Sequence, residues 1–183
     1  MKINKIAIPE NSLIHGILPE VHYADCYSVD FQNERAITVE DVARTFFQSI
    51  PGWVLFLLDL RNWVVRWFGL KSENAREVLA RLDGDPIEPG KPFGIFQVIQ
   101  KNADEILMGE EDKHLDFRVS IGLKSKTGND YTASVATIVQ FNHFSGRLYF
   151  LPVKQFHKLI VKRMMAILGK KLEEGFLTAD GRR

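Results

Sequence analysis

The stretch that decides the fold is residues 153–172, VKQFHKLIVKRMMAILGKKL, which directly follows Pro152. Its apolar residues recur at helical spacing, while lysines gather on the other side of the helical wheel. The apolar positions are Phe156, Leu159, Ile160, Met164, Ile167 and Leu168. We predict a long amphipathic C-terminal helix that starts at Pro152, because proline is well tolerated in a first helical turn.

The chain before this helix predicts an opening strand, two helices and then several strands with no helix between them. His22–Phe31 reads as the first strand, and its irregular alternation leaves room for a β-bulge. Thr38 has the side chain of a helix N-cap, and a second helix should run from Trp53 to about Phe68. The later strands are expected at Phe93–Gln100, Glu105–Gly109, Leu115–Leu123, Tyr131–Phe141 and Arg147–Phe150.

Short turns join these strands, so neighbouring strands must be antiparallel. The order predicts an α+β, helix-grip fold: a curved antiparallel sheet of about six or seven strands, two short helices, and a long C-terminal helix on the concave face. We expect a single domain over 1–183, with a lead-in arm at 1–20, a core at 21–174 and a tail at 175–183. Trp53 and Phe117 should lie in its hydrophobic core.

Composition restricts the possible functions. The 183 residues are 45% hydrophobic and 26% charged, as in a globular domain. A formal net charge of +1 argues against a dedicated nucleic-acid binder. Cys26 is the single cysteine and is expected to be a small buried filler in a reducing cytoplasm. Met1–Gly16 lacks the apolar core of a secretory signal, and Arg61 and Arg66 interrupt the most apolar run, so no stable membrane insertion is expected.

Three groups of segments resemble an uncharacterised bacterial domain family. They are Pro51-Gly52-Trp53 with Leu60-Arg61-Asn62 and Phe68-Gly69-Leu70; His114–Arg118; and Gly146–Phe150 with Pro152-Val153 and Phe156–Val161. The element order is similar to that of the START-like superfamily, also called SRPBCC, the helix-grip fold of the birch-pollen allergen. The resemblance implies a hollow between sheet and helix. Superfamily members bind lipids, hormones and polyketides, and some are cyclases or aromatase-like enzymes, but the family itself has no established activity.

His157 is the candidate catalytic residue, because it falls within the apolar arc of the last helix. There it could orient a ligand or transfer a proton near neutral pH. The alternative is a core histidine bonded to a backbone carbonyl or a carboxylate. Arg61 and Arg118 could bind a ligand carboxylate through the planar guanidinium group. Alternatively, Arg61 and Asp116 or Arg118 could form an ion-paired framework that fixes the helices against the sheet.

The expected hollow would have walls of aromatic and aliphatic side chains. The candidates are Phe156, Ile160, Phe117, Tyr131 and Tyr149. Three functions stay open: a binding module for a small apolar or amphipathic molecule, an enzyme acting in the same hollow, and an interaction domain whose hollow is filled by its own side chains. Glu110, Glu111 and Asp112 indicate a solvated turn rather than a metal site, and we expect no metal and no cofactor.

Overall fold

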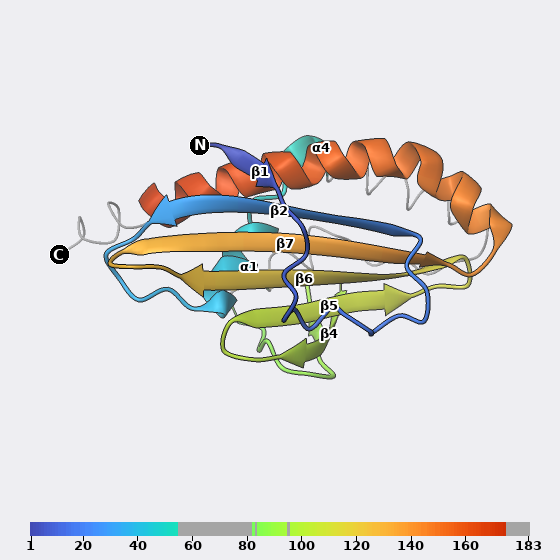
Figure 1. Cartoon of the computed structure of the whole chain (residues 1–183), viewed down its shortest axis with the longest axis horizontal. Helices are drawn as coiled ribbons and strands as arrows, with labels where there is room; N and C mark the ends of the chain where they lie inside the picture. Colours follow the sequence, from blue (N-terminus) through green and yellow to red (C-terminus); the bar gives the residue numbers. More distant parts are fainter. Residues whose placement is uncertain (55–81, 83, 95, 175–183) are drawn as a thin grey trace.

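A computed structural model describes residues 1–54, 82, 84–94 and 96–174 of the chain. In this part of the chain seven strands form one curved antiparallel sheet, in the order β1-β2-β7-β6-β5-β4-β3 (Figure 1). The strands are Ile3–Lys5 (β1), Tyr23–Gln32 (β2), Pro92–Phe93 (β3), Phe96–Lys101 (β4), Glu105–Glu111 (β5), Leu115–Ser125 (β6) and Asp130–Phe141 (β7). The helices are Val39–Phe47 (α1) and Phe144–Glu174 (α4). The predicted α+β class, with an antiparallel sheet and a long last helix, is confirmed.

Both faces of this sheet are covered. One face, which we call the helix face, packs against α1 and α4, and its core includes Val29, Ile121 and Met165. The other face, the arm face, is covered by the first twenty residues, where Ile14 and Leu18 pack near Cys26 and Leu107. Figure 1 shows the N-terminal segment crossing one side of the sheet and α1 lying on the opposite side. The predicted lead-in arm is thus a structural layer, and its residues 3–5 add an edge strand.

The buried carboxyl group of Glu105 attaches the arm to the sheet. Oε1 of this residue accepts hydrogen bonds from the hydroxyls of Ser12 and Ser120. Its Oε2 accepts one from the backbone N–H of Leu13 at 2.9 Å. Because a buried carboxyl group needs such partners, these contacts explain how an acidic side chain can lie 8% exposed at the start of β5.

Strand β2 pairs with β7 without a register shift, from Tyr23 opposite Val139 to Gln32 opposite Asp130. The bulge considered for this strand is therefore wrong. The apolar residues of β2 do not follow one alternating pattern, because both faces of the strand are buried. Cys26 faces the arm, while Tyr27 faces the helices.

The single strand predicted at Phe93–Gln100 is two antiparallel strands, β3 and β4. Gly94 lies between them with φ +61°, a left-handed conformation that favours glycine and reverses the chain. A register shift between Val98 and Gln100 then interrupts the pairing of β4 with β5.

Helix α4 begins at Phe144, so the predicted strand Arg147–Phe150 and the predicted helix start at Pro152 are both wrong. Gly146 and Phe150 are buried, and Val153 is partly buried. The three residues are four and three positions apart, so they lie on the same side of the helix, facing the sheet. A four-residue stretch is too short for alternation to distinguish a strand from a helical turn, which is why the sequence pattern misleads here.

Two residues explain how the first half of α4 is formed. At Gly146, an added Cβ would lie 2.1 Å from the carbonyl oxygen of His114, so only glycine allows the first turn this close to the sheet. Pro152 is on the exposed side of the helix, where its missing N–H and its ring are tolerated with a bend. Figure 1 shows α4 curving over this half.

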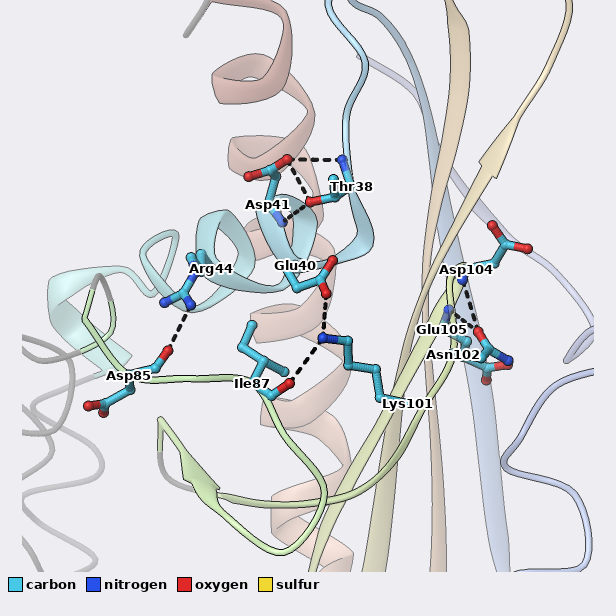
Figure 2. Close-up of polar contacts among 10 residues, drawn as sticks. All are labelled: Thr38, Glu40, Asp41, Arg44, Asp85, Ile87, Lys101, Asn102, Asp104 and Glu105. Carbon is cyan, nitrogen blue, oxygen red and sulfur yellow. Dashed lines mark hydrogen bonds and ion pairs between the residues drawn. The ribbon is translucent and has the colours of Figure 1, made fainter.

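Helix α1 has the predicted start at Thr38. The Thr38 side chain accepts from the backbone N–H of Asp41, and the Asp41 side chain accepts from the backbone N–H of Thr38 (Figure 2). Glu40 pairs with Lys101 of β4 at 2.5 Å, and Lys101 also donates to the carbonyl of Ile87. Burial acts to raise the pKa of Glu40, but the hydrogen bond and charge of Lys101 outweigh it and hold the pKa below its usual value. These contacts fix α1 to the sheet.

Trp53 is 41% exposed, so its predicted place in the core is wrong. It follows Pro51-Gly52, shortly after the end of α1 at Phe47. Phe117 is half-buried and packs against the core as expected. The rest of the predicted second helix and the tail at 175–183 lie outside the described residues.

Candidate functional site

A single charged residue interrupts the helix face of β2. The side chains of this strand that point toward the helices are Tyr23, Asp25, Tyr27, Val29 and Phe31, in strict alternation. Asp25 is only 4% exposed although its neighbours along the face are aromatic and aliphatic. A carboxyl group in such surroundings costs free energy unless it is hydrogen-bonded or paired with a charge. Its partners therefore mark the candidate site.

Among the described residues, two side chains contact the carboxyl group of Asp25. The hydroxyl of Tyr23 donates to Oδ2, and Nε2 of His157 lies 3.3 Å from Oδ1. Burial raises the pKa of the Tyr23 phenol, and the hydrogen bond to Asp25 and the charge of Asp25 raise it further. Tyr23 consequently remains a neutral hydrogen-bond donor to Asp25.

Thr137 lies directly opposite Asp25 in the pairing of β2 with β7, so both side chains point to the helix face. Its side chain is buried, and its Oγ1 has no hydrogen-bond partner among the residues that the structure describes. Natural structures rarely leave a buried hydroxyl unsatisfied. Thr137 therefore presents a free hydrogen-bonding group beside the carboxyl group of Asp25.

Aromatic rings surround this polar group. Tyr23 contacts Phe150 of α4 with ring centroids 5.0 Å apart and His157 with centroids 6.0 Å apart. Phe117 packs against the same cluster, and its ring lies 5.1 Å from that of Phe96. The side chain of His157 is 21% exposed, so the site reaches the surface at this residue.

Comparison with known proteins identifies the family. Residues 17–164 match the model of a family described as "Protein of unknown function (DUF2867)". The chain belongs to this family. No curated protein matches the chain. The resemblance to an uncharacterised domain family is thus confirmed for DUF2867, and the match includes Tyr23, Asp25, Thr137 and His157.

The structure of this DUF2867 chain brings some of the predicted site residues together. His157 lies in the site, Phe117 borders it, and Ile160 packs against the core of the helix face. Tyr131 lies on β7, as Thr137 does, but near the other end of the strand, where its ring stacks on that of Phe31. Arg61 lies outside the described residues.

Two predicted site residues lie on α4 but are exposed. Phe156 is 51% exposed and Tyr149 is 44% exposed. Tyr149, which was expected to come from a strand, is helical because α4 starts at Phe144. Both residues are therefore left out of the candidate site.

Arg118 lies on the arm face of the sheet. Its neighbours Phe117 and Val119 both point to the helix face, so strand alternation directs Arg118 to the other side. Its guanidinium group donates to the Glu111 side chain at 2.7 Å and to the carbonyl of Glu110 at 3.2 Å. The structure thus contains an ion pair between Arg118 and Glu111, on the face of the sheet opposite to the helices.

Sequence reasoning missed Tyr23, Asp25 and Thr137 as members of the site. A signal for Asp25 was present, because it is the one charged residue at every second position from Tyr23 to Phe31. Thr137 gives no such signal, since threonine is common in strands and only the register places it opposite Asp25.

Other site types find little support in the described part of this DUF2867 chain. Among the described residues, no group of three or more His, Cys, Asp and Glu side chains could hold a metal ion. None of the described helices is both long and apolar enough to cross a membrane. Cys26 is buried, as predicted, and burial followed by the charges of Asp25 and Glu105 raises its pKa to about 12. Its thiol is therefore a poor nucleophile at neutral pH.

Replacing His157 by phenylalanine should lower the free energy of unfolding by about 1–3 kcal/mol, because the buried Asp25 would lose its contact with the imidazole. The change in the midpoint of urea unfolding measures this effect. Lys158→Ala, one position along the same helix, is the control and should change stability little. An His157→Phe protein as stable as the native chain would show that the contact with Asp25 does not stabilise the fold.

Proposed function

We propose that this chain is a binding domain for a small, mostly apolar molecule that lies between α4 and the helix face of the sheet. The observation that carries the proposal is the buried Thr137 hydroxyl, which has no partner among the described residues and lies opposite the carboxyl group of Asp25. A molecule with an apolar body and one polar end would satisfy this hydroxyl while contacting the aromatic walls.

The polar end of this molecule should be a hydrogen-bond donor. In the described part of the chain, Asp25 accepts from Tyr23 at one oxygen and contacts His157 at the other, and a carboxylate has about four lone-pair positions. Asp25 can therefore accept from a hydroxyl or an amine, while Thr137 can accept from or donate to the same group. A ligand carboxylate would instead lie next to the charge of Asp25 and would be disfavoured.

The proposal agrees with the resemblance of the element order to that of the START-like superfamily. A long C-terminal helix across an antiparallel sheet is the arrangement of the START-like superfamily, to which we assign the chain as part of this proposal. Members of that superfamily place ligands between these two layers. Fold alone does not establish function, so the argument rests on Thr137 and Asp25 and not on the superfamily.

Decanol, decylamine and decanoate provide a matched set of ligands, which differ only in the polar end. Calorimetric titration should show binding of decanol and decylamine to the full chain, with decanoate about tenfold weaker or worse. Asp25→Asn should weaken decylamine more than decanol, because it removes charge but keeps an acceptor. If decanoate binds best, the assignment of a donor end is wrong.

Thr137→Val separates a binding role of Thr137 from a structural one. Valine has nearly the same shape and removes a hydroxyl that is unsatisfied in the described structure, so the melting temperature should stay the same or rise. Decanol affinity should fall about 2- to 10-fold, the loss expected for one hydrogen bond. Thr132→Val on the same strand is the control, since the Thr132 hydroxyl already donates to Asp30 at 2.6 Å.

Two outcomes would reject the binding proposal. A Thr137→Val protein with a clearly lower melting temperature would mean that the hydroxyl already supports the fold. If none of the three decyl compounds binds, the space along the helix face is filled by the chain itself, as in the interaction-domain alternative.

A second candidate function is catalysis by proton transfer at the same site. The contact between His157 Nε2 and Asp25 Oδ1 favours it, because a carboxylate that orients an imidazole is the arrangement of a general base. Mass spectrometry of the molecule that co-purifies with the chain, before and after incubation, distinguishes the two functions. An unchanged mass supports binding alone, while a changed mass that requires His157 supports catalysis.

A further inference from the structure

A row of large apolar side chains lies exposed along the first half of α4, on the side away from the sheet. We call this row the outer face of α4. Its members are Phe144 (79% exposed), Leu148 (60%), Leu151 (65%), Phe156 (51%) and Leu159 (58%). They lie within about four turns of one helix: Phe144, Leu148 and Leu151 follow one another at i+4 and i+3, and Phe156 is followed by Leu159 at i+3. Single exposed leucines are ordinary on protein surfaces, but five large apolar side chains exposed on one half of a helix indicate a contact surface.

The charge of α4 indicates which surface it contacts. Between Phe144 and Leu172 the sequence has no aspartate or glutamate. The basic residues of the same stretch are Arg147, Lys154, Lys158, Lys162, Arg163, Lys170 and Lys171. The chain as a whole has a formal net charge of only +1, so this helix concentrates positive charge that the rest of the molecule balances.

Part of this basic charge forms a line beside the outer face. The ammonium group of Lys154 lies 5.3 Å from the ring centroid of Tyr23, and that of Lys162 lies 5.6 Å from the ring centroid of Tyr27. Both rings belong to β2, so these lysines border α4 on its β2 side, with Lys158 one turn from each. The helix thus has a buried face toward the sheet, a basic border and an apolar outer face.

This arrangement fits the surface of an anionic lipid bilayer. A helix lies in the membrane interface when its apolar side chains can enter the boundary between headgroups and acyl chains while flanking lysines reach the headgroups. Phenylalanine and leucine are suited to this depth, and each nearby lysine or arginine adds attraction to anionic lipid. We propose that the outer face of α4 docks this chain on the surface of an anionic bilayer, with α4 parallel to the membrane plane.

Flotation of the full chain with vesicles tests this proposal. The chain should float with vesicles of phosphatidylcholine and phosphatidylglycerol, and bind at least tenfold more weakly to vesicles of phosphatidylcholine alone. High salt should reduce the binding, because screening shortens the reach of charges from about 8 Å to about 3 Å at 1 M.

Two variants examine the two parts of the surface separately. Leu151→Glu should reduce binding to the mixed vesicles about tenfold or more, because it places a charge in the middle of the outer face. Lys158→Gln should reduce it about fivefold, the effect of one basic side chain. Val21→Glu is the matched control, since Val21 is 52% exposed but lies outside α4. Circular dichroism should show that all three variants fold.

Three results would overturn the proposal. The first is no binding of the native chain to the mixed vesicles. The second is equal binding by the native and Leu151→Glu proteins, since the outer face would then not be in contact with lipid. The third is a dimer of the native chain that Leu151→Glu dissociates, without binding to vesicles, which would make the outer face a contact between two copies of this chain.

Discussion

Glu105→Ala should lower the free energy of unfolding by about 3–5 kcal/mol. The substitution leaves two serine hydroxyls and the backbone N–H of Leu13 without their acceptor, so the loss should exceed the about 1–3 kcal/mol that a single unsatisfied buried donor costs. It also detaches the arm, whose Ile14 and Leu18 cover the apolar side chains of the arm face. Urea unfolding monitored by fluorescence measures the loss.

Two further variants make this result specific. Glu105→Gln keeps the shape and one acceptor oxygen, so it should lose clearly less stability than Glu105→Ala. Glu110→Ala removes an exposed carboxyl group from the same strand and should change stability by less than about 0.5 kcal/mol. If Glu105→Ala behaves like Glu110→Ala, the arm is held by its apolar contacts alone.

The sheet could be predicted from the sequence where only one register is compatible with the apolar pattern. From Leu115 to Leu123 every second residue is apolar, and β6 forms there as expected. Strand β2 was harder, because the arm covers the face that would otherwise face solvent. An arm with Pro9 and Pro19 and no regular period gives no sign that it forms a layer.

The candidate site could be predicted only in part, for a similar physical reason. The position of His157 on the helical wheel was enough to place it toward the sheet. Its partner Asp25 lies 132 residues earlier, and the pairing needs both the sheet register and the true start of α4. The start of α4 depends on Gly146 fitting against the carbonyl of His114, a contact that no periodic pattern contains. Local sequence patterns therefore predict most of the helices and strands, while the site depends on packing between residues far apart in the sequence.

Phe47→Ala should lower the free energy of unfolding by about 3–5 kcal/mol, the range for removing a large aromatic ring from a packed core. Phe47 ends α1 and is 2% exposed. Its ring meets those of Phe93 at 5.5 Å and Phe96 at 5.7 Å, both edge-on. For a chain of this length the loss corresponds to a melting temperature lower by roughly 6–20 °C, which differential scanning calorimetry would measure.

The same substitution at Phe144 is the matched control, because that ring is 79% exposed and should contribute almost nothing to folding. Both variants remove the same atoms from a helical residue, so the difference between their melting temperatures measures the contribution of core packing. Phe96 contacts both Phe47 and Phe117, and Phe117 packs in the cluster that contains Tyr23. The cavity left by Phe47→Ala should therefore loosen the aromatic wall of the site, whereas Phe144→Ala should leave it unchanged. Equal melting temperatures for the two variants would mean that α1 does not hold this end of the sheet.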